Sequence, residues 1–479
     1  MNLKHEWLVA SGAERITLQN PASPKNEVAT RPVSTMEDIV NAVRLSVEAQ
    51  RGWRESSVAA RASVLRKTGD ILLRDEEKLA KVITSETGKH LRDSLSEVRN
   101  AAAVFHYYAG RSWNAIGEIL PSTRTGVKLS AIRVPVGVVA VISPWNFPVN
   151  LLTTKLAPAL AMGNAVAIKP STIGAGASLI LIEALYEAGL PEHVVNIILG
   201  DGSVVGDALI KADGISAVSF TGSTAVGRRV AMSATNLGRR YLCEMGGKNA
   251  AVVMSDADLD LAIETLIPAV FSASGQKCTA TSRIIVESNI ASEFTERFVD
   301  RVKSIQFGDP LDEGSYSGPV VSKSQFLSIV ATVENARSSG QRLLTNWKLP
   351  NSPDLDGYFV PPTVFDEVAP DSMLFQDEIF GPVVSITKAK DLRTAVDFVN
   401  DSVYGLSASI FTRSLDAAAL FEQDVACGVV NVNLPTTGIE FQSPFAGWKG
   451  SGTSYQEQGD EAFSFYTAGK TVAVRTAFP

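Results

Sequence analysis

The chain has 479 residues, of which 45% are hydrophobic and 20% charged, and its formal net charge is −7 at pH 7. This length and composition predict a soluble globular protein with two or three domains. The negative charge, with lysines and arginines dispersed, argues against nucleic acid or an anionic membrane as the main partner. Residues 1–7 are charged where a secretory signal would be apolar, and no apolar run approaches the ~20 residues of a membrane span. We therefore expect a cytoplasmic protein.

The cysteines and histidines exclude several kinds of site. Three cysteines do not make a disulfide framework, and Cys243 and Cys427 lie in apolar, strand-like runs typical of a core. The four histidines, at positions 5, 90, 106 and 193, lack the spacing of metal ligands. No Gly-x-Ser-x-Gly motif occurs. We expect no metal site and neither metal- nor serine-dependent hydrolysis.

The first part of the chain is predicted to be helical. Apolar residues recur at helical spacing, and the expected helices are 36–50, 57–73, 75–87 and 91–109, with Gly88 ending the third. Residues 127–134 instead alternate as in one strand of a hairpin, which we expect to project or to pair outside the main sheet.

Two series of alternating strands and helices follow. In the first, the expected strands are 136–142, 165–168, 194–199 and 217–220, and the expected helices 151–162, 175–188, 203–211 and 223–235. In the second, strands are expected around positions 252, 284, 383 and 410, with helices at 259–271, 291–304, 323–338 and 392–400. Such alternation predicts an α/β fold with parallel sheets covered by helices on both faces.

Three strand ends of the first series carry residues suited to a dinucleotide, which binds beyond the carboxyl ends of parallel strands. They are Ser143-Pro-Trp-Asn-Phe-Pro148, Lys169-Pro-Ser171 and Thr221-Gly-Ser-Thr-Ala-Val-Gly227. The last opens a helix, whose N-terminal amides favour an anion. The loop 200–206 is closer to the usual glycine spacing, but Asp201 would repel a phosphate there. Spacing alone leaves the choice between these two loops open.

The stretch Phe271–Arg283 leaves an apolar helix, passes through small residues and presents one thiol, Cys278, before the next strand. A lone cysteine is most often a small core residue. The polar, glycine-containing approach Gly275-Gln-Lys277 favours an exposed nucleophile instead, and the neighbouring Lys277 would favour the thiolate.

Seven motifs together closely resemble those of the NAD(P)-dependent aldehyde dehydrogenase superfamily, in the same order and spacing over nearly the whole chain. They are Pro144-Trp-Asn-Phe-Pro148, Lys169-Pro-Ser171, Phe220-Thr-Gly-Ser223, Glu244-Met-Gly-Gly-Lys-Asn249, Gly275-Gln-Lys-Cys278, Glu378-Ile-Phe-Gly-Pro382 and Pro444-Phe-Ala-Gly447. The resemblance implies two Rossmann-type open parallel-sheet domains plus a small β oligomerisation domain. We expect the dinucleotide-binding domain at 1–121 and 142–246, the catalytic domain at 247–448, and the oligomerisation domain at 122–141 and 449–479.

The resemblance also implies the roles of individual residues. Cys278 would be the nucleophile, Asn146 and the backbone N–H of Cys278 the oxyanion hole, and Glu244 the base that activates the hydrolytic water. The phosphates would lie at the helix after Thr221-Gly-Ser rather than at the loop 200–206. Glu378 would hold the nicotinamide ribose, with Phe380 near the ring. The implied cofactor-binding residues are Ser143, Trp145, Lys169, Ser171, Thr172, Thr221, Gly222, Ser223, Gly246, Glu378 and Phe380.

Some positions depart from the family pattern. Thr172 stands where NAD-preferring members usually have a glutamate that repels a 2′-phosphate, so we expect NADP to be accepted, and a preference for NADP over NAD is open. Cys243 and Ala446, at positions that are usually leucine and glycine, are interpreted as packing variants.

The substrate is predicted from the stretches 278–283, 433–438 and 457–459, which are similar to 2-oxoglutarate semialdehyde dehydrogenases. Arg283 is one candidate for binding the distal carboxylate, and a structural ion pair is the competing interpretation. Thr154 stands where succinate semialdehyde enzymes usually have arginine, which argues against that substrate. Three further hypotheses are a general aldehyde dehydrogenase, an enzyme forming an acyl phosphate or acyl coenzyme A, and a cofactor-binding structural protein. A homodimer or homotetramer is expected.

Overall fold

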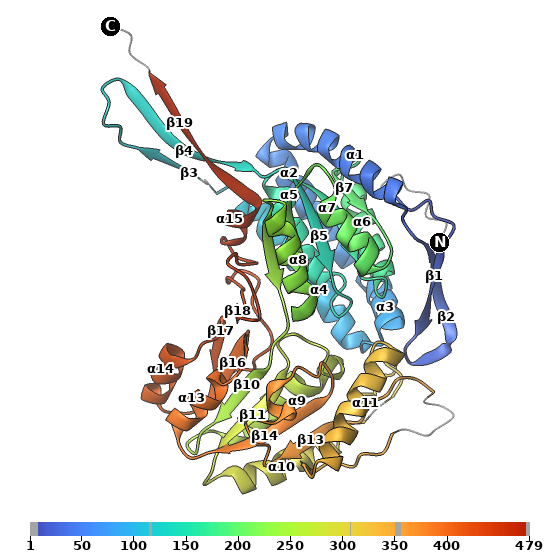
Figure 1. The fold of residues 1–479 in the computed structure, drawn as a ribbon, viewed down its shortest axis with the longest axis vertical. Helices are drawn as coiled ribbons and strands as arrows, with labels where there is room; N and C mark the ends of the chain where they lie inside the picture. Colours follow the sequence, from blue (N-terminus) through green and yellow to red (C-terminus); the bar gives the residue numbers. More distant parts are fainter. Residues whose placement is uncertain (1–7, 115–116, 307, 350–355, 476–479) are drawn as a thin grey trace.

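Two open α/β sheets and a projecting β ribbon organise the protein, seen here in a computed structural model that describes residues 8–114, 117–306, 308–349 and 356–475 (Figure 1). His5 and the rest of segment 1–7 lie outside the described residues. Within these ranges no helix is both long and apolar enough to cross a bilayer.

The first sheet is five-stranded and entirely parallel, in the order β7-β6-β5-β8-β9. Its strands are β5 (Val138–Ser143), β6 (Ala165–Pro170), β7 (Val195–Ile197), β8 (Ile215–Thr221) and β9 (Arg240–Glu244). Every residue of β5 and β6 is buried, which explains why the central strands are short uninterrupted apolar runs in the sequence. The order reverses between β5 and β8, so the carboxyl ends of these two strands border the crevice where such sheets bind ligands.

Helices pack around this sheet, and all the expected ones except 203–211 are confirmed with shifts at their ends. They are α1 (Met36–Glu55), α2 (Val58–Arg74), α3 (Glu76–Thr87), α4 (Leu91–Arg111), α5 (Asn150–Ala161), α6 (Ala175–Glu187), α7 (Asp207–Lys211) and α8 (Thr224–Asn236). Gly88 ends α3 with φ of 74°, as predicted. The expected helix 203–211 is instead a π-helical turn, η1 (Gly202–Gly206), followed by α7.

The second sheet has seven strands in the order β12-β13-β14-β11-β10-β16-β17, all parallel except the edge strand β12. The strands are β10 (Asn249–Val253), β11 (Thr281–Glu287), β12 (Arg342–Leu343), β13 (Thr363–Asp366), β14 (Val383–Ala389), β16 (Ser407–Phe411) and β17 (Val429–Val432). Its helices are α9 (Leu259–Phe271), α10 (Ala291–Lys303), α11 (Lys323–Ser338), α12 (Met373–Gln376), α13 (Leu392–Asn400) and α14 (Leu415–Asp424).

The β ribbon extends away from the first lobe (Figure 1). It is a three-stranded antiparallel sheet of β3 (Gly117–Leu120), β4 (Val127–Pro135) and β19 (Thr467–Arg475), which follows the short helix α15 (Ala462–Tyr466). Strand 127–134 therefore does pair outside the main sheets. The pairing corrects two expected domain boundaries. The strand β3 belongs to the ribbon, although it was expected in the dinucleotide-binding domain. The strand β5 is the centre of the five-stranded sheet, although the expected boundary at 141 would cut it.

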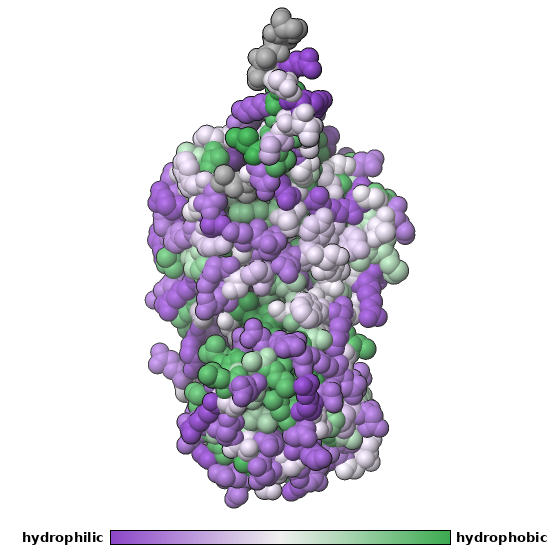
Figure 2. Space-filling view, turned by 90° about the vertical axis from the view of Figure 1, so that its left-hand side faces the viewer, coloured by the Kyte–Doolittle hydropathy of each residue, from purple (hydrophilic) through white to green (hydrophobic). Residues whose placement is uncertain are grey.

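Two small sheets were not predicted from the sequence. The hairpin β1 (Arg15–Asn20) and β2 (Ser23–Pro32) packs near α3, and β15 (Tyr404–Gly405) pairs with β18 (Trp448–Lys449). Figure 2 shows the face of the molecule that carries β17 and α14, where apolar side chains gather over the second lobe. Val432 and Leu434, at the end of this edge strand, are among the exposed apolar residues.

Candidate active site

The turn that presents Cys278 has an uncommon backbone. Helix α9 ends at Phe271, and Ala273, Ser274 and Gly275 then adopt left-handed φ values of 52°, 55° and 70°. A Cβ atom at Gly275 would lie 2.2 Å from the carbonyl oxygen of Gly381, so only glycine fits there. The hydroxyl of Ser274 donates to the carbonyl oxygen of Gly318 at 2.7 Å. This turn directs the chain back toward the first lobe just before the thiol.

Cys278 and Glu244 line one cavity of about 670 Å³ between the two lobes. Its wall comes from the N-terminal parts of α4 and α5, from the turn after α9, and from the segments 437–445 and 457–458. The thiol and the carboxylate are therefore both accessible from the same cavity.

Burial raises the pKa of the half-buried Cys278 thiol to about 12, and the carboxylates of Glu378 and Glu244 add to this effect. The expected attraction between Lys277 and the Cys278 thiolate is present, but burial outweighs it in the ligand-free protein. The Lys277 side chain is half-buried and donates a hydrogen bond to the hydroxyl of Ser272. Burial therefore disfavours the thiolate form of Cys278 in the ligand-free protein.

Asn146 is buried, and its Nδ2 atom donates to the backbone carbonyl oxygen of Gln276 at 3.1 Å. Gln276 in turn accepts the N–H of Val321 through its side-chain oxygen at 2.9 Å. The loop after β5 is thus joined directly to the loop that carries Cys278. An amide group has two N–H donors, so one remains for another acceptor.

Glu244 ends strand β9 and is buried. One carboxylate oxygen accepts the N–H of Gly447 at 3.3 Å, and the other finds no hydrogen-bond partner among the described residues. Burial raises the pKa of Glu244 to about 8, although the nearby Lys155 opposes the shift. Lys155 is itself buried and paired with Glu457. A carboxyl group with this pKa can accept a proton near neutral pH.

The residues expected to bind a dinucleotide do converge at the carboxyl edge of the five-stranded sheet. The hydroxyls of Ser143 and Thr221, at the ends of β5 and β8, are buried without a hydrogen-bond partner in the described part of the chain. Ser223 stands at the N-cap of α8, and its side chain makes no capping bond. Unpartnered polar groups at the point where strand order reverses fit a dinucleotide that would supply their partners.

Lys169, Ser171 and Thr172 follow at the end of β6. Lys169 is buried, which lowers its pKa to about 8, and the carboxylate of Asp201 opposes this shift. Asp201 accepts the N–H of Ser203 at 2.7 Å, so its charge lies in the loop 200–206 as expected. That loop therefore presents a carboxylate, not a row of free amides, to the same edge of the sheet.

Glu378, Gly246, Trp145 and Phe380 lie together on the catalytic side of this edge. Glu378 accepts the N–H of Gly247 at 3.0 Å, and a Cβ atom at Gly246 would lie 2.2 Å from the Glu378 carboxylate. The rings of Trp145 and Phe380 meet edge to face, with centroids 5.5 Å apart. The glycine at 246 leaves the space that Glu378 uses.

Arg283 does not face the cavity, so its proposed contact with the substrate is wrong. It is buried and donates to three backbone carbonyl oxygens, of Lys248, Phe398 and Val399, at 2.8–3.1 Å. Its role is structural, although its partners are carbonyl groups rather than the expected carboxylate. Cys243 in β9 and Cys427 are buried as expected, but Cys427 lies in the loop before β17.

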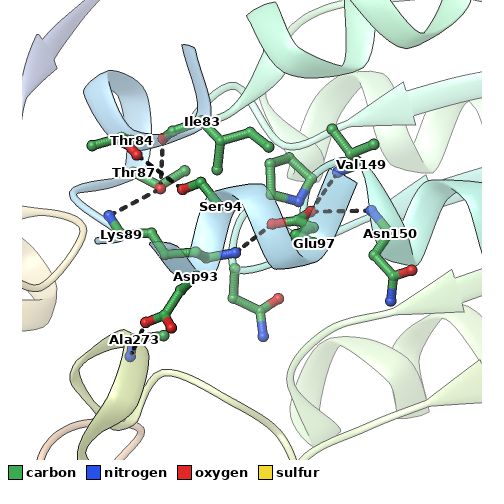
Figure 3. A network of polar contacts seen from close by, with 12 residues as sticks. Ile83, Thr84, Thr87, Lys89, Asp93, Ser94, Glu97, Val149, Asn150 and Ala273 are labelled. Carbon is green, nitrogen blue, oxygen red and sulfur yellow. Dashed lines mark hydrogen bonds and ion pairs between the residues drawn. The ribbon is translucent and has the colours of Figure 1, made fainter. Parts of the chain in front are cut away.

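The sequence did not indicate several residues of the cavity wall. Lys155 and Glu457 are 302 positions apart in the chain and have no local pattern that would pair them. Asp93 and Glu97 lie in the expected helix 91–109, and no sequence motif singled them out. The structure buries Glu97 and turns both side chains toward the active-site loops (Figure 3).

A thiol and a carboxylate that line one cavity beside the switch point of a dinucleotide-type sheet are the arrangement expected of a dinucleotide-dependent oxidoreductase. The chain matches the Aldehyde dehydrogenase family over residues 7–472 and belongs to that family. It is therefore an NAD(P)-dependent aldehyde dehydrogenase.

Relatives support the assignment over the whole length. The alpha-ketoglutaric semialdehyde dehydrogenase of Bacillus subtilis (strain 168) is 41% identical, with 98% of this chain and 96% of the relative covered. The 2,5-dioxopentanoate dehydrogenase of Saccharolobus solfataricus is 40% identical, with 98% of both chains covered. A crystal structure of betaine aldehyde dehydrogenase from Staphylococcus aureus in complex with NAD+ is 31% identical, with a TM-score of 0.95 over 99% of this chain and 94% of that one.

Proposed function

We propose that this enzyme oxidises a semialdehyde that carries a distal carboxylate, in particular 2-oxoglutarate semialdehyde, to the free dicarboxylic acid. The relatives from Bacillus subtilis and Saccharolobus solfataricus are named for this substrate, also called 2,5-dioxopentanoate. The observation that carries the mechanism is that Cys278 and Glu244 line the same cavity. A general or a succinate semialdehyde dehydrogenase is the second candidate.

In the first step the Cys278 thiol loses its proton to solvent through the open cavity, and the sulfur attacks the aldehyde carbon as thiolate. The new C–S bond pushes the carbonyl electrons onto oxygen, which becomes an oxyanion. The free N–H of the Asn146 amide and the backbone N–H of Cys278 would bind this oxygen. One such donor typically contributes ~3–4 kcal/mol of transition-state stabilisation.

A bound nicotinamide dinucleotide supplies a hydride acceptor, so that the oxyanion collapses to a thioester as the aldehyde hydrogen leaves with its electron pair. Ser143, Lys169, Ser171, Thr172, Thr221, Gly222 and Ser223 would bind the dinucleotide along the sheet edge. Trp145, Gly246, Glu378 and Phe380 would border its reactive end. The Glu378 carboxylate accepts a hydrogen bond from the backbone N–H of Gly247. Its oxygens could also accept hydrogen bonds from the ribose hydroxyls of a bound dinucleotide.

Glu244 would then remove a proton from water, whose oxygen attacks the thioester carbon. The C–S bond breaks, the acid leaves and the thiolate returns. The second oxygen of Glu244 is available for this water because it has no partner among the described residues. The proton can pass to neighbouring groups, since Lys155 interacts with Glu244 and is paired with Glu457, which lines the same cavity. Hydrolysis by Glu244 predicts free acid rather than an acyl phosphate or acyl coenzyme A.

The distal carboxylate requires donors in the cavity. Among the described residues of its wall, Lys277 is the one lysine or arginine, and Asn150, Gln442 and Gln458 supply amide groups. The carboxylates of Asp93 and Glu440 in the same wall repel the substrate carboxylate, so it must be bound by such donors. Lys277 keeps two N–H donors beyond the one it gives to Ser272. We assign the carboxylate contact to Lys277 in place of Arg283.

NADP is expected to be accepted because Thr172 presents no negative charge to a 2′-phosphate, while Lys169 lies at the same strand end. The ribbon of β3, β4 and β19 and the apolar edge at β17 suit a homodimer or homotetramer. A reduced thiol nucleophile is consistent with a cytoplasmic location.

The test is a panel of C4 to C6 semialdehydes and uncharged aliphatic aldehydes, followed at 340 nm with each dinucleotide and no added acyl acceptor. We expect the highest kcat/KM for 2-oxoglutarate semialdehyde and release of the free acid. Cys278→Ser should abolish oxidation, whereas Cys427→Ala should not. Lys277→Met should raise KM about tenfold for the semialdehyde and leave uncharged aldehydes unchanged, since a charged contact contributes about 1.5–3 kcal/mol. Equal kcat/KM for hexanal and the semialdehyde would reject the substrate assignment.

A further inference from the structure

One face of helix α4 contacts both loops that carry the proposed catalytic groups (Figure 3). Asp93 and Glu97 are four residues apart, so they lie on the same side of the helix, about 6 Å apart along its axis. Asp93 contacts the loop of Cys278, and Glu97 contacts the loop of Asn146. The helix therefore connects the nucleophile of one lobe with the oxyanion donor of the other.

Glu97 supplies a missing helix cap. Val149, at the N-cap of α5, has no side-chain oxygen to accept a hydrogen bond from the first turn. One carboxylate oxygen of Glu97 accepts the N–H groups of Val149 and Asn150 at 2.9 and 3.0 Å. The positive end of the helix dipole stabilises this negative charge. Because Val149 follows Asn146 by three residues, Glu97 fixes one end of the loop that carries the amide.

Lys89 holds the same loop from its middle. Its ammonium group pairs with the second oxygen of Glu97 and lies 3.8 Å from the centre of the Phe147 ring. The side chains of Lys89 and Glu97 are 4% and 0% exposed, so solvent does not compete for the pair. Phe147 is the residue directly after Asn146, which places the cation–π contact next to the amide.

Asp93 acts on the other loop. Its carboxylate accepts the N–H of Ala273 at 3.1 Å. Ala273 is the first of the three left-handed residues that turn the chain toward Cys278, a conformation that is unfavourable for alanine without compensating contacts. The hydrogen bond that the Ala273 N–H donates to Asp93 is such a contact, and Ala273 lies five residues before the thiol.

We propose that Lys89, Asp93 and Glu97 form a positioning network that sets the distance between the Asn146 amide and the Cys278 sulfur. The proposal rests on the roles proposed above for Cys278 and Asn146. The oxyanion lies one bond from the carbon that sulfur attacks, so the amide must be placed correctly relative to the sulfur. A misplacement of about 1 Å from a mutation away from the chemistry costs roughly 10²-fold in rate.

The first test compares Asp93→Ala with Asp93→Asn, measured on whichever aldehyde the wild-type enzyme oxidises. Alanine removes the acceptor for the Ala273 N–H, and asparagine keeps one. We expect Asp93→Ala to lower kcat by roughly 10- to 100-fold, with dinucleotide Kd changed less than about threefold. Aldehyde KM should be the same in Asp93→Ala and Asp93→Asn, because both variants remove the Asp93 charge from the cavity wall. Asp93→Asn should restore most of kcat. A purely structural role would lower thermal stability without this separation of kcat from KM.

The second test is the double variant Lys89→Met/Glu97→Gln, which removes both buried charges at similar volume and so should fold. The variant keeps an acceptor oxygen for the N-terminus of α5, but it loses the ion pair and the cation over the Phe147 ring. We expect kcat to fall by roughly 10- to 100-fold, as for Asp93→Ala, with little change in KM. The control is Arg99→Gln, which breaks an exposed ion pair with Glu76 on the outer face of the same helix and should leave kcat unchanged.

Two results would overturn the proposal. In one, Asp93→Ala and the double variant fold and keep kcat within about twofold of the wild type. In the other, Asp93→Asn is as impaired as Asp93→Ala. If Asp93→Ala does not fold, the double variant decides. Oxidation that survives Cys278→Ser would instead reject the proposed function. The two failures can be told apart, because the network variants are compared with the wild-type rate and not with Cys278→Ser.

Discussion

The Asn146 side chain donates a hydrogen bond from Nδ2 to the carbonyl oxygen of Gln276 over 3.1 Å, two residues before the thiol. The contact orients the amide from the catalytic loop itself and leaves its second N–H free. An oxyanion hole made of Asn146 and the backbone of Cys278 would thus be assembled from two lobes, and its geometry would depend on how closely they pack.

Replacing Asn146 by alanine should therefore lower kcat by roughly 10²–10³-fold, because one oxyanion donor is lost. KM should change little, since the interaction strengthens only as charge develops on oxygen. A matched control is Asn164→Ala, a buried asparagine of the same lobe that bonds to the backbone around Gly137 and Ala159. It should reduce thermal stability and keep kcat. Steady-state kinetics with thermal melts separate the two outcomes.

The pKa of Cys278 predicts how the resting thiol reacts. Burial, Glu378 and Glu244 raise this pKa to about 12, so few molecules carry a thiolate at pH 8 without ligand. Glu378→Gln removes one of the negative charges and should lower the pKa of Cys278. Alkylation of Cys278 by iodoacetamide at pH 8, followed by mass spectrometry, should then be faster than in the wild type. An unchanged rate would show that Glu378 does not act on the thiol.

How far the sequence predicts the fold depends on whether the relevant forces are local. The central strands β5 and β6 are buried on both faces and therefore stand out as short apolar runs between helices. Gly88 marked the end of α3 because a left-handed C-cap favours glycine. The hairpin of β1 and β2 was missed because its second strand contains the polar run Ser23-Pro-Lys-Asn-Glu27, with no alternation.

The same distinction applies to the site. Cys278, Glu244 and Asn146 were located through motifs, and the structure brings Cys278 and Glu244 into one cavity. Arg283 was assigned from its position at a strand end, which does not tell whether a side chain points to the cavity or to backbone carbonyls. The pairing of Lys155 with Glu457 and the contacts of Asp93 and Glu97 are long-range, so no spacing in the sequence predicts them.

Glu244 should impose a pH dependence on turnover. A base acts in its deprotonated form, and the pKa of Glu244 is raised to about 8, so thioester hydrolysis should increase from pH 7 to pH 9. Glu244→Gln should release about one equivalent of reduced dinucleotide per active site and then nearly stop, which a stopped-flow trace at 340 nm would show. Steady turnover by this variant without a burst would assign the base elsewhere.

The raised pKa of Glu244 also predicts how the stability of the folded protein depends on pH. Because the folded protein favours the protonated carboxyl, ionisation of Glu244 costs stability as pH rises from its ordinary pKa of 4.5 toward about 8. The variant Glu244→Gln does not incur this cost. Its melting temperature relative to the wild type should thus increase between pH 5 and pH 8, by a few degrees at most. A constant difference across this range would contradict the shift in pKa.

Dinucleotide choice should depend on Thr172, which is half-buried at the end of β6, three residues after Lys169. Thr172→Glu places a carboxylate where a 2′-phosphate would lie, so repulsion should lower kcat/KM for NADP by at least tenfold, since like charges at such range repel by more than about 1.4 kcal/mol. The value for NAD should stay the same or rise, because the carboxylate can accept hydrogen bonds from ribose hydroxyls. Thr172→Gln is the matched control, with similar size and no charge, and it should keep most of the NADP activity. If glutamate and glutamine lower NADP activity equally, size rather than charge decides the preference. If neither does, the adenosine ribose binds away from this strand end.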